Sequence, residues 1–233
     1  MAARTRRPYT ESREYIKIEG NTVKLISEQV NRVIKLEDFI TTTGGYSGIS
    51  TPILPNGCKY FRQKQSHSVL VIEKPPQTKR LHWTGMNPDT TKINWKLAFP
   101  YTIFVLEFQE NAITSQSRLY YKKTPIISLD DMLFHTNLCN VYSYDRICTG
   151  NMRSVGESMS EKADSFIAAF WQSNFNPDLI ADQFNVDAIR IPQVSNLEAW
   201  QTASKDTPLF PLEINWRESS TLAAAINSFF GDQ

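Results

Sequence analysis

The chain of 233 residues has few cysteines, few histidines and no long apolar run. Its three cysteines are an odd number and do not form the disulfide framework of a small secreted protein. The three histidines are scattered, and none has a partner at metal-ligand spacing, which argues against a zinc site. No apolar run approaches the roughly 18 residues that cross a bilayer. We therefore expect a cytoplasmic protein with reduced thiols, no membrane segment, no secretory leader and no cofactor.

Positive and negative side chains are nearly balanced, and the formal net charge is only +1. Such a balance gives no global field for nucleic acid, so we do not expect nucleic-acid binding. The local basic excess lies at the start of the chain, in Arg4, Arg6, Arg7, Arg13 and Lys17. We predict a basic, solvated N-terminal arm over residues 1–13, with an anchor for an acidic partner as the alternative.

Residues 14–60 have the pattern of a β region followed by a glycine-rich loop. A Gly-Asn pair separates two β-branched runs and predicts a hairpin of 15–19 with 22–26, followed by a strand at 32–36. The glycines within 41–57 are not followed by the Gly-Lys-Ser/Thr of a phosphate-binding loop. We therefore predict a flexible connection there.

Residues 61–233 are predicted to form one α+β domain. Short apolar runs separated by turns indicate an antiparallel β-meander, in which residues 101–108 pair with 119–121. Strands are expected at 68–73, 80–83, 94–98, 99–110 and 118–123.

After residue 150 the pattern becomes helical. Ser158 and Glu161 have the spacing of a capping box. The apolar residues that follow recur at helical spacing and predict a buried stripe of Ala163, Phe166, Ile167, Phe170 and Trp171. Further helices are expected at 178–184, 196–203 and 221–230, the last of them capped by Ser220.

The segment NVYSYDRICTGN, residues 140–151, has two interpretations. Cys148 is either a buried structural cysteine or a thiol that Arg146 favours as the thiolate. Asn140 either bonds its own turn or folds back to donate to an oxyanion beside the thiol. His135 lies thirteen residues before Cys148, which gives no support to a protease-type Cys–His pair.

The same segment resembles the active-site region of ubiquitin-conjugating enzymes. Those enzymes carry His-Pro-Asn, a turn with a glycine, and Ile-Cys, with eight residues from Asn to Cys. Here Asn140 and Ile147-Cys148 have that spacing. Leu138 and Cys139 replace the His and Pro, and Asp145 replaces the turn glycine.

Residues 95–151 are more similar still to a prokaryotic branch, the family typified by protein B of the PRTRC plasmid cassette. The resemblance rests on FPYTIFVLEF, RLYYKKTPIISLDDMLFHTNL, NVYSYDRIC and TGN. That branch lacks the motif histidine, in agreement with Leu138. The resemblance to this branch implies a ubiquitin-conjugating-like fold, here with an N-terminal β extension and a C-terminal helical extension.

The chemistry that this resemblance implies is thiol-based transfer. Cys148 would accept a ubiquitin-like protein as a thioester and pass it to an amine. Asn140 would stabilise the oxyanion, and Asp145 would orient or deprotonate the amine. The implied partners are a ThiF-type activating enzyme and a ubiquitin-like protein.

Two other functions stay open at this point. The replacements at Leu138, Cys139 and Asp145 are of the kind that accompanies an inactive binding module of the same fold. Alternatively, the irregular stretches at 1–13, 41–57 and 185–212 are typical of a phage or mobile-element assembly protein. Such a protein would form oligomers or bind assembly partners through residues 1–13 and 41–57.

Overall fold

The computed structural model describes residues 15–19, 22–26, 31–35, 53–84, 93–176, 179 and 190–231. The chain divides into two compact units, residues 1–52 and 53–233. The domain boundaries expected after residues 13 and 60 stay predictions. The arm at 1–13, most of the loop at 41–57 and most of the helix expected at 178–184 lie outside the described residues.

The first unit contains a three-stranded antiparallel sheet in the order β1-β2-β3. Its strands are β1 (Tyr15–Glu19), β2 (Thr22–Ile26) and β3 (Asn31–Lys35). The hairpin of β1 and β2 has the predicted bounds, and β3 begins one residue before the predicted strand.

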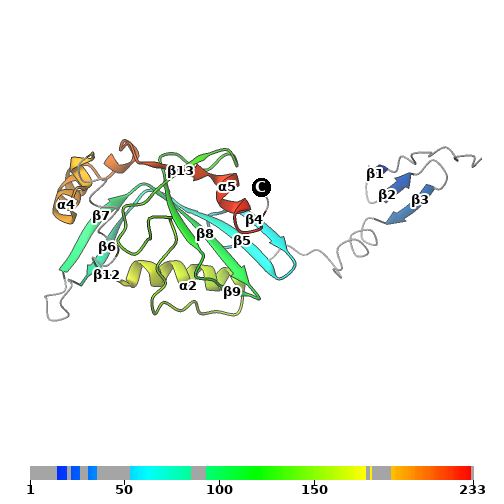
Figure 1. Ribbon diagram of the computed structural model, residues 1–233, viewed down its shortest axis with the longest axis horizontal. Coiled ribbons are helices and arrows are strands. Elements are labelled where there is room, and N and C mark those ends of the chain that lie inside the picture. The colour runs from blue at the N-terminus through cyan, green and yellow to red at the C-terminus, as the bar shows by residue number, and fades with distance from the viewer. Residues whose placement is uncertain are drawn as a thin grey trace, which may run out of the picture. The chain divides into compact units, whose positions relative to one another are not determined.

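The second unit is a mixed α+β structure built on a curled antiparallel sheet (Figure 1). The order along the main sheet is β13-β11-β10-β8-β5-β4, and β9 (Ala112–Ile113) pairs with β8. The bounds are β4 (Cys58–Lys64), β5 (His67–Lys74), β8 (Tyr101–Gln109), β10 (Arg118–Lys122), β11 (Met132–Phe134) and β13 (Glu218–Thr221). The predicted pairing of 101–108 with 119–121 is present, with Phe104 opposite Leu119.

A second sheet interrupts the chain order of the first. It has the order β12-β6-β7, formed by β6 (Gln77–Trp83), β7 (Ile93–Phe99) and β12 (Asn174–Phe175). β6 pairs with β7 along its length and runs parallel to β12 at its end. The expected meander is therefore not confirmed, because β6 and β7 leave the main sheet between β5 and β8.

The main sheet buries both of its faces. Alternate residues of β5 belong to two different apolar clusters, Leu70 and Ile72 to one, Val69 and Val71 to the other. Side chains alternate between the faces of a strand, so these clusters lie on opposite sides of the sheet. Helix α2 (Met159–Gln172) covers the first cluster and α5 (Leu222–Asn227) the second, as Figure 1 shows.

The helices follow their local signals closely. Ser158 and Glu161 form the predicted capping box of α2, and the five residues predicted for its stripe are the buried ones. Helix α4 (Leu197–Asp206) begins after the cap Asn196, one residue inside its predicted range. The N-cap of α5 is Thr221, so the prediction of Ser220 as the cap was wrong. Ser220 is instead part of β13, where it pairs with Leu133 of β11. Short 3-10 turns lie at η2 (Pro192–Val194) and η3 (Phe210–Leu212).

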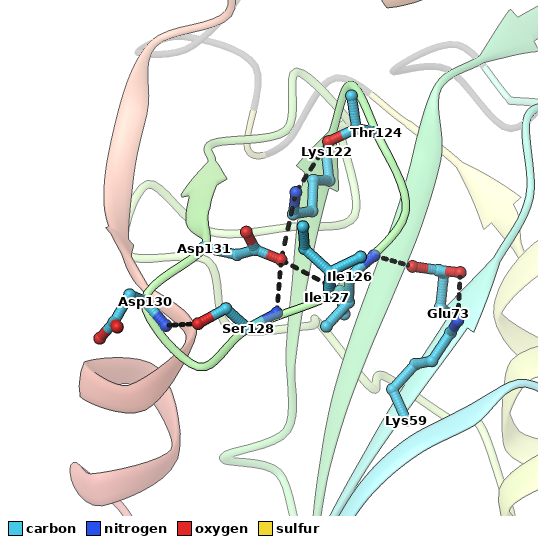
Figure 2. Close-up of polar contacts among 9 residues, drawn as sticks. All are labelled: Lys59, Glu73, Lys122, Thr124, Ile126, Ile127, Ser128, Asp130 and Asp131. Atoms are coloured by element: carbon cyan, nitrogen blue, oxygen red, sulfur yellow. Dashed lines mark hydrogen bonds and ion pairs between the residues drawn. The ribbon is translucent and has the colours of Figure 1, made fainter.

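The loop between β10 and β11 is held by the polar contacts drawn in Figure 2. Glu73 is 8% exposed, pairs with Lys59 at 3.2 Å and accepts the backbone N–H of Ile126 at 2.5 Å. Asp131 accepts the N–H of Ile127 at 2.8 Å and lies 3.4 Å from Lys122. Burial opposes ionisation of Asp131, but these hydrogen bonds and the ammonium outweigh it and lower the pKa of the carboxyl. These contacts fix the loop that leads into β11.

Across the described ranges, no helix combines the length and apolar character that spanning a membrane requires.

Candidate functional site

Residues 140–148 form a small hairpin. Val141 and Ile147 make an antiparallel bridge, and the N–H of Cys148 donates to the carbonyl of Asn140 at 2.8 Å. Val141 and Ile147 are 0% and 1% exposed, so the residues on either side of them point to the opposite face. This register places Asn140 directly across from Cys148. The eight-residue spacing seen in the sequence is thus the spacing of hairpin partners.

The hairpin turns through a three-residue loop that ends at Asp145. The N–H of Asp145 donates to the carbonyl of Tyr142 at 2.9 Å, and Asp145 has a φ of +67°. A left-handed residue closes hairpin loops of this length, and Asp tolerates that conformation better than most residues. Asp145 thus has a left-handed backbone conformation, which a glycine at this position, as in the ubiquitin-conjugating motif, would adopt without steric strain.

The carboxylate of Asp145 is buried and has two partners. Asp145 is 4% exposed, its Oδ1 lies 2.7 Å from Nδ1 of His135, and Ser219 donates its hydroxyl to Oδ2 at 2.7 Å. Its carbonyl also accepts the N–H of Leu119 at 2.9 Å. Asp145 therefore ties the turn to β10, to the segment after β11 and to β13.

A cleft of about 730 Å³ lies beside the hairpin. The hairpin supplies Asn140, Tyr142 and Cys148 to its wall, and the last turn of α2 supplies Gln172 and its cap Ser173. Cys148 is half-buried there. Asp145 is not part of the wall. The structure thus brings Asn140 and Cys148 together and leaves Asp145 behind the turn.

Tyr142 is a residue that the sequence reasoning missed. Its hydroxyl donates to Sγ of Cys148 at 3.8 Å, a contact that raises the pKa of Tyr142. Its ring stacks on Tyr144 at 5.4 Å, and the guanidinium of Arg146 lies 4.7 Å from the Tyr142 ring and 5.0 Å from the Tyr144 ring. Alternation along the hairpin could have identified it, since Tyr142 follows Asn140 by two residues and shares its face.

The amide of Asn140 is held by the end of α2. Its Nδ2 donates to the hydroxyl of Ser173 at 2.9 Å and to the carbonyl of Asn174 at 3.4 Å. The amide therefore shares the cleft with Cys148 while its hydrogen bonds fix the hairpin to the helix.

The other two cysteines differ from Cys148. Cys139 is 4% exposed, and burial raises its pKa to about 12. Cys58 is half-buried in β4, where burial raises its pKa and its thiol donates to the carbonyl of Tyr60 at 3.4 Å. Among the residues that the structure describes, no three His, Cys, Asp or Glu side chains come close enough to hold a metal ion.

Comparison with known proteins gives one result. The chain matches the family model described as prokaryotic E2 family D over residues 58–211, about two thirds of its length. No curated protein and no solved structure matches the chain. The narrower assignment to the PRTRC type stays a prediction. The matched region begins with β4 and includes both the Asn140–Cys148 hairpin and α2, and we conclude that the chain belongs to prokaryotic E2 family D.

Proposed function

We propose that the chain carries a ubiquitin-like protein as a thioester on Cys148 and transfers it to an amine. The observation that carries this proposal is the position of Cys148, half-buried in a cleft of about 730 Å³ and opposite Asn140 across a hairpin. The family match supports the reaction class, because E2 is the general name for ubiquitin-conjugating enzymes.

The first step is a thioester exchange. The thiolate of Cys148 attacks the carbonyl of a thioester that joins the ubiquitin-like protein to a ThiF-type activating enzyme. A new C–S bond forms, the old one breaks, and the activating enzyme leaves with its thiol restored. The hydroxyl of Tyr142 supports this step, because it donates to the attacking sulfur across 3.8 Å.

The second step is aminolysis. A neutral amine attacks the Cys148 thioester, a C–N bond forms, and the C–S bond breaks to return the thiol of Cys148. The amine gives up one proton to water or to the departing sulfur. The C-terminal end of α2 lines the cleft, and its partial negative charge attracts the amine while it is still an ammonium.

Asn140 and Asp145 have different parts in the proposal. The amide of Asn140 leaves Ser173 and donates to the oxyanion that forms during aminolysis. The carboxylate of Asp145 is already held by His135 and Ser219, so we propose that it acts by fixing the turn. A direct role with the amine would require Asp145 to give up both partners.

A loading assay with the neighbouring activating enzyme and ubiquitin-like protein tests the first step. Cys148→Ser should trap the ubiquitin-like protein as an oxyester that resists thiol reagents. Cys139→Ser and Cys58→Ser serve as controls and should load as the wild type does. Equal loading of all three variants, or no loading of the wild type by any neighbouring activating enzyme, contradicts the proposal. In the second case, oligomers at micromolar concentration would favour an assembly protein.

A single-turnover assay with the loaded protein separates the second step from the first. Asn140→Ala should load normally and lose about 10²-fold in the rate of transfer, the usual effect of removing one oxyanion donor. Asn174→Ala is a matched control, because Asn174 lines the same cleft and contributes its backbone carbonyl to the contact with Asn140. Equal transfer rates for the two variants would contradict the role of Asn140.

A further inference from the structure

A second groove, of about 460 Å³, lies between β6 and α2. Gln77 and Lys79 enter it from β6, and Asp164 and Trp171 enter it from α2. Gln77, Lys79 and Leu81 alternate with exposed residues of β6, and Leu81 is in the core under α2. Lys79 therefore projects from the side of β6 that faces the helix.

Positive charge dominates this groove. Asp164 is the carboxylate in its wall, and Lys74 already pairs with it at 3.7 Å. Lys79 and the neighbouring Arg80 also line the groove, and neither has an ion-pair partner in the part of the chain that the structure describes. The ammonium of Lys79 lies 5.8 Å from the ring of Trp171. Two cations are thus left over once the internal pair is formed.

Two buried hydrogen-bond donors in the same wall lack an acceptor. The Nε2 of Gln77 and the Nε1 of Trp171 have no hydrogen-bond partner among the described residues. Trp171 is 6% exposed, and its ring packs against Phe99 at 5.0 Å, so its N–H is held in place. An unsatisfied buried donor costs free energy and calls for an explanation. A ligand rich in acceptor oxygens would supply what both donors lack.

The strand beside the groove also has an open edge. β6 pairs with β7 on one side and with β12 only at His82 and Trp83 on the other. From Gln77 to Leu81 the second edge has no strand partner within the described ranges. A strand edge with free backbone groups can pair with an added extended peptide.

We propose that the groove between β6 and α2 binds an acidic segment of a partner polypeptide in extended conformation. The cations follow one another along a strand rather than converging on one point, which fits a chain of carboxylates better than a single anion. Gln172 lines both this groove and the Cys148 cleft, so the groove adjoins the cleft. The inference concerns binding alone and holds whether or not Cys148 forms a thioester.

Fluorescence anisotropy of a labelled, capped oligoglutamate peptide tests the proposal on the full chain. The wild type and Cys148→Ser should bind the peptide equally, with an affinity that falls as salt is added. Lys79→Glu should weaken binding by about tenfold, as expected for reversal of one partly exposed charge. Arg80→Glu should have a smaller effect, because the Arg80 side chain is more exposed to solvent than that of Lys79. Lys205→Glu, an exposed control on α4, should change the affinity by less than about twofold.

Three results would overturn the proposal. The first is an absence of peptide binding by the wild type at low salt. The second is an equal loss for Lys79→Glu and Lys205→Glu, which would show nonspecific attraction. The third is complete competition by inorganic phosphate at the concentration of peptide carboxylates, which would show a free-anion site. Trp171→Phe keeps the ring and removes the N–H, so it should weaken peptide binding by about two- to fivefold; unchanged binding would contradict the donor role.

Discussion

Cys139 and Cys148 lie nine residues apart in the same hairpin segment, yet their surroundings differ completely. Cys139 belongs to the apolar cluster that also contains Leu138, Val141 and Ile147. Cys148 has a hydroxyl donor, Tyr142, and a place in the wall of a cleft. One thiol is therefore part of the core, and the other is half-buried in the wall of a cleft.

Hairpin register is the cause of this difference. Val141 and Ile147 face the core, so Cys148, next to Ile147, faces outward across from Asn140. Cys139 lies before the paired residues, where the chain still runs through the core. It adds a second thiol to the segment, but one that faces the core. A thiol buried in apolar surroundings stays protonated and unreactive.

The largest expected effect is a difference in alkylation rate between the two thiols. At pH 8 a thiol with a pKa of about 12 is only about 10⁻⁴ thiolate, and burial further blocks Cys139. We therefore expect iodoacetamide to modify Cys148 at least about 10³-fold faster than Cys139 in the folded protein. Because the pKa of Cys139 is raised, its thiolate should form only as pH approaches 12.

Mass spectrometry of peptides after timed alkylation measures both rates in one sample. Alkylation in denaturant is the control and should bring the two rates to within a few-fold of each other. Similar rates for Cys139 and Cys148 in native buffer would show that register does not separate the two thiols.

The second effect concerns Asp145, which holds the turn between the two cysteines. Asp145→Ala should lower the free energy of unfolding by about 2–4 kcal/mol, because it leaves His135 and Ser219 without their buried acceptor. The substitution should also raise the alkylation rate of Cys139, since local opening of the hairpin exposes the core. Urea denaturation measures the first quantity and timed alkylation the second.

Two companion variants separate the causes of that loss. Asp145→Gly removes the carboxylate but accepts the φ of +67°, so it should be about 1 kcal/mol more stable than Asp145→Ala. Asp130→Ala removes an exposed carboxylate in the loop before β11 and should cost less than about 0.5 kcal/mol. Equal stabilities for Asp145→Ala and Asp130→Ala would show that the buried contacts do not hold the turn.

The features that could be predicted from the sequence are those set by residues close to one another along the chain. The capping box and buried stripe of α2 were right in every residue, because both depend on spacings of three and four. The cap of α5 was off by one because β13 pairs with β11, far earlier in the chain. The separation of β6 and β7 into a second sheet also depends on pairing with β12, which local patterns do not specify.

The same division holds for the candidate site. The Asn140–Cys148 spacing could be recognised because a hairpin is a local structure. The contacts of Asp145 with Ser219 and of Asn140 with Ser173 could not, because their partners lie 74 and 33 residues away. Tyr142 was within reach of the sequence, since alternation alone places it on the face of Cys148.

The smallest expected effect isolates the hydroxyl that distinguishes Cys148 from Cys139. Tyr142→Phe keeps the stack on Tyr144 and the contact with Arg146 but removes the donor to Sγ. The alkylation rate of Cys148 at pH 7 should fall by about two- to fivefold, because the sulfur loses this weak hydrogen bond. The rate of Cys139 and the free energy of unfolding should stay as in the wild type.

Tyr144→Phe is the matched control for this last comparison. Tyr144 is 53% exposed and stacks on Tyr142, whereas the hydroxyl donor to Cys148 is Tyr142. A fall confined to Tyr142→Phe assigns the effect to the hydroxyl, and an equal fall in both variants assigns it to the stack and Arg146. The hydrogen bond raises the pKa of Tyr142, so the phenol keeps its proton at neutral pH and remains a donor under the assay conditions. A Cys148 rate unchanged by Tyr142→Phe would mean that partial exposure alone separates the two thiols.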